Sequence, residues 1–378
     1  MLSLIEQLGV VDEARPDAVS FMDEAKRLAE HPRFYQRMHL DFRGRMYTSR
    51  SLVNYQGDDE YRCLIEFAEG VELNAEGYEA LLFHAANLWE PAELPSGELP
   101  KYLKKVAVGR ERLEQFIYYA ENAVATQAEW RVNSESGAEL DDPLLFIRAC
   151  MELRDATTKK RLIKKKGYVT HLPVEVDQTN SVIQHLALFY GDRDVAEMCN
   201  LMVESDFYST IANGWRIEGL SDNQKRTVVK KIVVPRCYGA GYRRIAQQEL
   251  DNLPFLDHLD IDGKRQLALQ GIHRVEQAVP SIRTYRRDMK DICDQWGCPP
   301  DGEMAWSTMS GFEVHFRPVR VDQVRFRVPK SREERYKRIQ LSARYVSPIL
   351  HETELRRGVQ ANLVHSVDAA LAHMTKAA

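Results

Sequence analysis

A segment near the middle of the chain carries residues suited to binding a nucleotide. Arg226 and Lys230 are four residues apart, so both cations project from one face of a helix. Tyr238 follows eight residues after Lys230, on much the same side. Two cations followed by a flat ring match the charge and shape of a nucleoside triphosphate. An amphipathic helix with a solvated basic face would show the same pattern, so this signal is weak on its own.

Asp177 ends an apolar segment, 168–176, whose β-branched residues predict a mostly buried strand. At the edge of a sheet, a carboxylate can hold a divalent metal ion, which offsets its loss of hydration. Alternatively, Asp177 caps the helix that follows, because Asp is among the best N-capping residues. Taken alone, capping is the better explanation.

Asp41–Arg45 (DFRGR) places two arginines, Arg43 and Arg45, around Gly44. The glycine lets a phosphate approach the backbone closely while the two guanidinium groups bind it. Taken alone, a surface turn with solvated arginines is the better explanation of this segment.

A second polar group lies in the C-terminal segment: Asn362, His365, Ser366, Asp368 and His373. His365 and Asp368 are one helical turn apart and could bond to each other. The spacing of the histidines is not that of a helical zinc site.

The elements that hold these residues follow from apolar periodicity and from breakers. Helices are expected at 18–29, 75–89, 101–130, 181–190, 221–238, 280–296 and 360–378, and strands within 34–55 and at 168–176, 304–316 and 321–328. Ser221–Gln224 has the form of a capping box and opens the helix that carries Lys230. Pro235, near the end of that helix, removes one backbone hydrogen bond and should kink it.

Composition is that of an ordinary globular protein of 378 residues, with 44% hydrophobic and 29% charged residues. No segment approaches the roughly 20 uninterrupted apolar residues of a membrane helix. The net charge of −4 does not by itself indicate a nucleic-acid-binding protein, although the segments 159–166, 225–231 and 317–338 are basic. The six cysteines form no CxxC pair, which predicts reduced thiols in a cytoplasmic protein.

In this order and spacing, the segments resemble the single-subunit RNA polymerases of phages and mitochondria, from about Ser20 to the end of the chain. The matching blocks are DFRGRMY (41–47), NYQGDD (54–59), EGYEALLFHAAN (76–87), VDQTNSVIQHLA (176–187), RTVVKKIVVPRCYG (226–239), WSTMSGFEV (306–314) and NLVHSVDAALAHM (362–374). Block 176–187 resembles the family's motif A, with Ser181, Gln184 and His185 also matching, and 226–239 resembles motif B. Related DNA polymerases place a glutamate where this chain has Val182, which favours ribonucleotides.

The resemblance implies an α+β, mainly helical fold: a right-hand polymerase with a palm sheet and an inserted helical fingers module, lacking the N-terminal domain and most of the thumb. We expect a helical lead-in at 1–32, which would be a remnant of the thumb. The palm with motif A would occupy 33–204, and the fingers with motif B would occupy 205–362. The segment 363–378 would begin the return to the palm.

The resemblance also implies the chemistry: DNA-directed transfer of nucleotides to the 3′ end of RNA, assisted by two Mg²⁺ ions. Asp177 and the carbonyl of Gln178 would be metal ligands. Arg226 and Lys230 would bind the triphosphate, and Lys230 could protonate the leaving pyrophosphate. Tyr238 would stack near the new base pair, and His365 would lie near the sugar. Arg43 and Arg45 would hold the backbone of the template or hybrid.

Some residues depart from the family's pattern. Met309 and Glu313 replace prolines, and Ala369–Ala372 stands where the family has two residues before His-Met. The family's second catalytic carboxylate lies in a His-Asp motif C, and this sequence has no His-Asp dipeptide. The chain alone is therefore expected to be inactive or nearly so.

Two explanations remain open: a fragment of a longer polymerase, or one subunit whose partner supplies motif C and the N-terminal elements. The expected partners are a DNA template, RNA product and nucleoside triphosphates, with no membrane. The expected setting is the cytoplasm of a phage-infected bacterium, ahead of a mitochondrion. From a different functional class, the alternative is a non-catalytic nucleic-acid-binding protein derived from such a polymerase.

Overall fold

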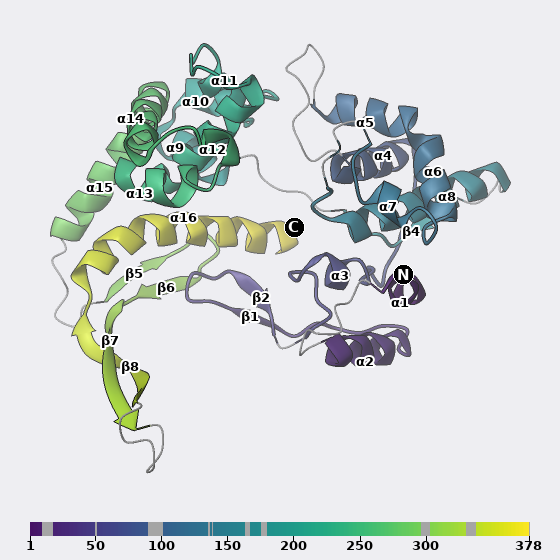
Figure 1. Ribbon diagram of the computed structural model, residues 1–378, viewed down its shortest axis with the longest axis horizontal. Coiled ribbons are helices and arrows are strands. Elements are labelled where there is room, and N and C mark those ends of the chain that lie inside the picture. Colours follow the sequence, from purple (N-terminus) through teal and green to yellow (C-terminus); the bar gives the residue numbers. More distant parts are fainter. Residues whose placement is uncertain are drawn as a thin grey trace. The chain divides into compact units, whose positions relative to one another are not determined.

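The computed structural model describes residues 1–9, 18–49, 51–89, 101–134, 137, 139–162, 167–174, 180–295, 303–329 and 338–377 (Figure 1). The chain forms two compact units. Unit 1 comprises Met1–His39 and Tyr47–Asp177, and unit 2 comprises Leu40–Met46 and Gln178–Ala378. Among the described helices, none combines the length and apolar character that a bilayer crossing requires.

Unit 1 is a helical assembly around one aromatic core. Its helices are α1 (Leu2–Leu8), α2 (Ala18–Ala29), α3 (Asp59–Arg62), α4 (Ala75–Trp89), α5 (Lys101–Glu111), α6 (Leu113–Glu121), α7 (Gln127–Trp130) and α8 (Pro143–Leu162). Helices α4 and α6 pack on α8. Phe116 meets Trp89 and Phe146 edge to face, and all three side chains are buried.

A carboxylate from the 54–59 block caps the N-terminal end of α8. Asp59 accepts hydrogen bonds from the backbone N–H groups of Leu144 (2.7 Å) and Leu145 (2.8 Å), which have no partner inside the helix. Burial raises the pKa of Asp59 to about 6. This residue of the block therefore has a structural role.

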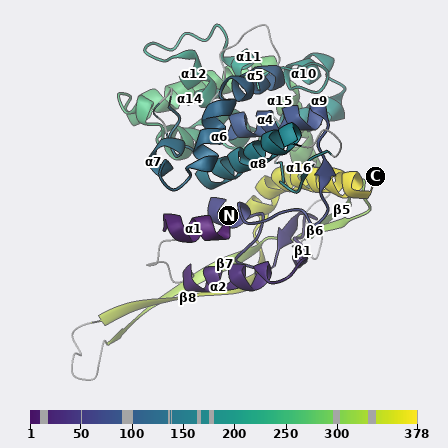
Figure 2. The same cartoon turned by 90° about the vertical axis from the view of Figure 1, so that its right-hand side faces the viewer.

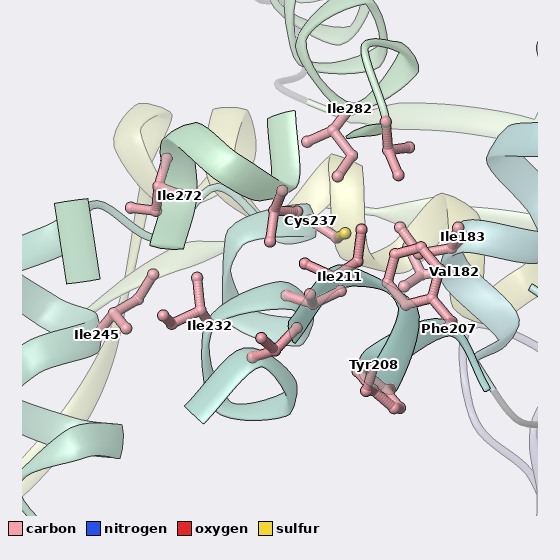
Figure 3. Packing of buried hydrophobic residues seen from close by; sticks show 14 of the residues in the cluster. Val182, Ile183, Phe207, Tyr208, Ile211, Ile232, Cys237, Ile245, Ile272 and Ile282 are labelled. Atoms are coloured by element: carbon pink, nitrogen blue, oxygen red, sulfur yellow. The ribbon is translucent and has the colours of Figure 1, made fainter. Parts of the chain in front are cut away.

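Unit 2 contains the other helices and the longer strands. Its helices are α9 (Ser181–Tyr190), α10 (Arg193–Met198), α11 (Phe207–Ala212), α12 (Asp222–Cys237), α13 (Tyr242–Ile245), the π-helical turn η1 (Ala246–Leu250), the 3₁₀ turn η2 (Pro254–Leu256), α14 (Ile261–Ala278), α15 (Ser281–Gln295) and α16 (Glu352–Ala377). Its core joins α9, α11, α12, α14 and α15, and Figure 3 shows Ile232 and Cys237 of α12 among Ile272, Ile282 and Phe207.

Helix α12 begins and ends where the sequence predicts. The Ser221 hydroxyl accepts from the N–H of Gln224 (3.3 Å), and the Gln224 side chain accepts from the N–H of Ser221 (2.9 Å). Pro235 lies in the last turn, so the helix ends two residues later at Cys237. Tyr238 is its C-cap residue.

The strands form four two-stranded sheets. They pair β1 (Met38–Leu40) with β2 (Met46–Thr48), β3 (Val71–Glu72) with β4 (Val169–Thr170), β5 (Met304–Ser307) with β6 (Glu313–Phe316), and β7 (Val319–Pro329) with β8 (Arg338–Leu350). Figures 1 and 2 show β7–β8 as a long ribbon that extends from the rest of unit 2. Most of its cross-strand pairs keep one antiparallel register, from Val321–Val346 to Pro329–Arg338.

The expected α+β class, dominated by helices, is confirmed. The long buried strand expected at 168–176 is wrong for the described residues 168–174: the strand comprises only Val169 and Thr170, with flanking backbone hydrogen bonds at Tyr168 and His171, and Val169 is 47% exposed. β-Branched residues form a buried strand only where a partner strand and a covering layer exist, and β4 pairs with just two residues of β3. The helix expected at 101–130 is three helices, interrupted at Arg112 and at 122–126. The palm and fingers boundaries remain predictions.

Five cysteines are buried and free: Cys63, Cys150, Cys199, Cys237 and Cys293. Cys298 lies outside the described residues.

Candidate nucleotide and nucleic-acid site

The DFRGR turn of unit 2 is built around Asp41. Its Oδ1 accepts from the backbone N–H groups of Arg43 (2.9 Å) and Arg45 (3.0 Å), and its Oδ2 accepts from Nε (2.8 Å) and Nη2 (2.6 Å) of Arg43. Burial raises the pKa of Asp41, but these bonds and the Arg43 charge outweigh it, so the pKa stays below its usual value. Asp41 therefore remains ionised and fixes the direction of Arg43.

Gly44 lets the turn close against a neighbouring ring. Its φ of 85° is one that residues with a Cβ rarely adopt. A Cβ added there would also lie 3.1 Å from the Phe312 ring. Both the backbone angle and the close approach require glycine at this position.

Arg43 reaches from the turn to His365 on α16. Nη1 of Arg43 lies 3.0 Å from Nδ1 of His365. A guanidinium only donates, so Nδ1 is the acceptor and the proton of the neutral ring is on Nε2. Burial and the charges of Arg45 and Arg43 lower the pKa of His365 to about 4. At neutral pH, His365 is thus an uncharged ring with one N–H donor.

Tyr238 lies beside this histidine. The two rings meet edge to face, with centroids 5.3 Å apart. Burial, with the nearby Asp368 carboxylate and Cys237, raises the pKa of Tyr238 to about 12. Its hydroxyl therefore stays protonated, while its ring lies beside that of His365.

Asp368 joins the turn to two helices. Its Oδ1 accepts from Nε2 of buried His185 on α9 at 2.6 Å. Its Oδ2 lies 3.4 Å from both Nη2 of Arg45 and the hydroxyl of Ser181. The bond considered above between His365 and Asp368 does not form, because each side chain has a partner from another element.

Arg226 and Lys230 differ in their surroundings, although they share a face of α12. Nε of Arg226 donates to Asp206 at 2.6 Å, and its guanidinium lies over the Tyr208 ring at 5.2 Å from the centroid. Burial lowers the pKa of Arg226 to about 10, so it remains a cation at neutral pH. Lys230 is exposed. At about 1.5 Å per residue, Arg226 lies roughly 18 Å along the helix from Tyr238.

The 306–314 block braces the turn against α16. The indole N–H of Trp306 donates to the hydroxyl of buried Ser366 on α16 at 3.0 Å. Phe312, in the turn that joins β5 to β6, lies against Gly44. The aromatic residues of this block therefore position the turn and the helix that bear Arg43 and His365.

Residues 71–378 match the family of DNA-dependent RNA polymerases. This match covers well over half of the 378 residues. The chain belongs to this family.

Curated relatives of this polymerase chain include mitochondrial enzymes. The mitochondrial DNA-directed RNA polymerase of Schizosaccharomyces pombe is 25% identical over 287 residues, which cover 71% of this chain and 23% of that protein. A probable DNA-directed RNA polymerase of Neurospora crassa is 30% identical over 247 residues, 61% of this chain and 25% of that protein. The human mitochondrial enzyme is 30% identical over 231 residues, 56% of this chain and 18% of that protein. The chain therefore spans about a quarter or less of these relatives.

The expected metal ligands of the polymerase, Asp177 and Gln178, lie outside the described residues. The structure does assign the cap of α9 to another residue: the Asn180 side chain accepts from the N–H of Ile183 at 3.4 Å. The capping alternative for Asp177 is thereby wrong. Within the described part of the chain, no group of three His, Cys, Asp or Glu side chains could hold a metal ion. The carboxylates of Asp41 and Asp368 in unit 2 are bonded to Arg43 and His185.

The structure thus brings together four of the predicted site residues: Arg43, Arg45, Tyr238 and His365. Arg226 and Lys230 lie further back along α12. The sequence assigned no role to Asp41 or Asp206 and left that of Asp368 open. The two-residue spacing of Asp41 and Arg43 could have indicated a turn held by its own carboxylate. The pairing of Asp206 with Arg226 joins residues 20 positions apart and left no local pattern.

Proposed function

We propose that this chain carries the nucleotide-selecting part of a DNA-directed RNA polymerase, which transfers nucleotides from nucleoside triphosphates to the 3′ end of RNA on a DNA template. One observation carries the proposal: a neutral His365, held by Arg43 through Nδ1, next to the protonated Tyr238. Three separate blocks of the chain supply these residues. Packing of the turn on α16 alone would not require a part-buried arginine–histidine contact of this kind.

The ribose is the part of the substrate that this pair fits. Nε2–H of His365 is a donor for which the described residues supply no acceptor, and the Tyr238 hydroxyl can both donate and accept. A ribose hydroxyl offers the matching groups, and buried donors discriminate strongly against an analogue that lacks them. Val182, buried on α9, carries no polar group that would bind the sugar.

The triphosphate would bind along α12. Lys230 is exposed and can approach the phosphates directly, and in the reaction it would supply a proton to the leaving pyrophosphate. Arg226 would exchange its bond to Asp206 for a phosphate oxygen, since both partners are anionic and accept from the same guanidinium.

Arg45 is the better placed of the two turn arginines for holding the template or hybrid backbone. Its side chain is 34% exposed, and its contact with Asp368 is long, at 3.4 Å. Arg43 is 22% exposed and is occupied by Asp41 and His365. Arg45 would contact a phosphate, while Arg43 holds the histidine.

Divalent metal use is general in this family, and here we assign Asp177 and the carbonyl of Gln178 as ligands of two Mg²⁺ ions. When bound, the ions would supply the charge that assists phosphoryl transfer. A further carboxylate is needed for useful affinity. We assign it to a segment or partner subunit that carries the family's second catalytic carboxylate. The named relatives are mitochondrial, so a mitochondrial setting is at least as well supported as a phage-infected cytoplasm.

Template-directed extension of RNA annealed to DNA tests this function. The chain would be assayed with Mg²⁺, with and without a candidate partner that carries the second carboxylate motif. We expect extension only in the complemented mixture, with ribonucleotides preferred over deoxyribonucleotides. Asp177→Ala should abolish extension, and His365→Ala should reduce the preference for ribonucleotides. If no mixture extends the RNA but the hybrid still binds, the chain is a non-catalytic nucleic-acid-binding protein.

A further inference from the structure

Three arginines in unit 2 surround a single carboxylate. The carboxylate is that of Glu276, near the end of α14. Arg236, in the last turn of α12, donates to its Oε1 from both Nε (2.7 Å) and Nη2 (2.5 Å). Arg283 and Arg286, in the first turns of α15, lie 3.9 Å and 3.8 Å from its oxygens. These last two distances are too long for hydrogen bonds.

The charges of this arginine cluster do not balance. Three guanidinium groups face one carboxylate, and Arg236 donates to that carboxylate from Nε and Nη2 while its Nη1 donates to the carbonyl of Ala240. The Nε atom of Arg286 is covered and has no hydrogen-bond partner among the described residues. Burial, followed by the charge of Arg236, lowers the pKa of Arg286, although the carboxylate of Glu276 opposes the shift.

The position of the two α15 arginines adds to this imbalance. The first turn of α15 contains no acidic residue, and the N-terminal end of a helix disfavours cations. Arg283 is 60% exposed and Arg286 is 29% exposed, whereas Arg236 is 14% exposed. The two α15 side chains can therefore meet a ligand from solvent, with Arg236 and Glu276 holding the helices behind them.

A purely structural role would use fewer cations. Arg283 approaches the backbone carbonyl of Glu276 at 3.5 Å, so it can stabilise the C-terminal end of α14. That contact does not account for Arg286. An anion bound between the two guanidinium groups would supply the missing acceptors.

We propose that the arginine cluster binds phosphates of a nucleic-acid strand, at a place distinct from the triphosphate and ribose site. The proposal rests on the proposed polymerase function for the presence of such a strand. Arg236 and Tyr238 are two residues apart at the end of α12; the first contacts α14, and the second contacts His365 on α16. A strand that passes the end of α12 would reach Arg283, which is 60% exposed, and Arg286. Guanidinium groups suit phosphates because they offer paired donors.

The salt dependence of binding tests this proposal without requiring catalysis. The full chain would be titrated with fluorescein-labelled single-stranded DNA, and with a preformed DNA–RNA hybrid, at several KCl concentrations. Each phosphate contact on a single strand contributes about 0.7 to the slope of log K against log salt, or about fivefold in affinity at 0.1 M salt. Arg283→Gln/Arg286→Gln should lower the slope by about 1.4.

The matched control is Arg193→Gln, on α10 of the same unit, where the arginine is 75% exposed and paired with Glu197. It should leave the slope unchanged. Arg283→Gln alone, at an exposed site, covers the case in which the double variant fails to fold, and it should lower the slope by about 0.7. A slope that stays at the wild-type value in a folded variant overturns the cluster proposal and leaves the polymerase function intact. Absence of any salt-dependent binding by the wild-type chain overturns both.

Discussion

At the scale of single residues, the chemistry of the site depends on the charge of His365. Its pKa of about 4 follows from burial and from two neighbouring arginines, Arg45 and Arg43. We expect NMR titration of the histidine-labelled chain, assigned with His365→Gln, to show a midpoint near this value. Arg43→Met should raise the pKa, because it removes one like charge from the ring.

The same shift predicts a pH effect on stability. The folded pKa of His365 is lower than its ordinary value of 6.5, so the unfolded chain takes up the proton first as the pH falls. His365 should therefore lower the stability of unit 2 progressively between pH 6.5 and 4, and His365→Gln should flatten that part of the profile. A ring that titrates near 6.5 in the folded chain would contradict both expectations.

Asp368 is the second residue whose replacement has a definite outcome. Asp368→Asn removes the charge that faces Arg45 and replaces the carboxylate oxygen that accepts the 2.6 Å bond from buried His185 with a neutral amide oxygen. We expect unit 2 to lose about 1.5–3 kcal/mol in urea unfolding, the usual cost of a hydrogen bond to a charged group. Asp257→Asn, at an exposed position, should cost less than about 0.5 kcal/mol. Equal losses of stability in the two variants would contradict the role of Asp368 in joining the DFRGR turn, α9 and α16.

At the scale of elements, the DFRGR turn can be tested with two glycines that differ in one respect. Gly44 and Gly219 both have positive φ, of 85° and 78°, so alanine at either position strains the backbone by about 1–2 kcal/mol. An added Cβ at Gly44 also meets the Phe312 ring at 3.1 Å, whereas at Gly219 it meets nothing within 4 Å. Gly44→Ala should therefore destabilise the chain more than Gly219→Ala does. Gly44→Ala should also weaken binding of the hybrid, whereas Gly219→Ala should leave that binding unchanged. Fluorescence anisotropy with the hybrid measures the difference, and equal binding by both variants would contradict a role of the turn.

Local signals account for the elements that the sequence predicted well. The capping box at Ser221 and the apolar periodicity of 181–190 depend on neighbouring residues alone, and both helices begin where expected. The strand at 168–176 failed because burial of a strand depends on partners from elsewhere in the chain. Helix α14 and strand β8 were not predicted at all, although α14 supplies the buried Leu267, Ala268 and Val275.

The same difference between local and long-range signals applies to the candidate site. The family resemblance selected Arg43, Tyr238 and His365 from the sequence, whereas their types and spacing alone gave only weak signals. Their contact was not predictable, because Arg43 and His365 are 322 positions apart. Arg226 shows the opposite case: its place on the helix was right, but its bond to Asp206 depends on how α11 packs against α12. Long-range packing decides which of the selected residues meet.

At the scale of the whole molecule, each unit has a hydrophobic core of its own. Leu153 is fully buried in the unit 1 core, and Ile232 is fully buried in the unit 2 core, among α12 and its neighbours (Figure 3). Truncating either to alanine should cost about 2–5 kcal/mol, since each change leaves a cavity. We expect Leu153→Ala to accelerate amide hydrogen exchange in peptides of unit 1 only, and Ile232→Ala in peptides of unit 2 only. Each variant is the control for the other, with exchange followed by mass spectrometry at low urea concentrations. If both variants accelerate exchange equally throughout the chain, the two units unfold as one cooperative structure. In that case Leu153→Ala, although it lies in unit 1, would also disturb the contact between Arg43 and His365 in unit 2. The affinity for the hybrid would then fall in both the Leu153→Ala and the Ile232→Ala variants.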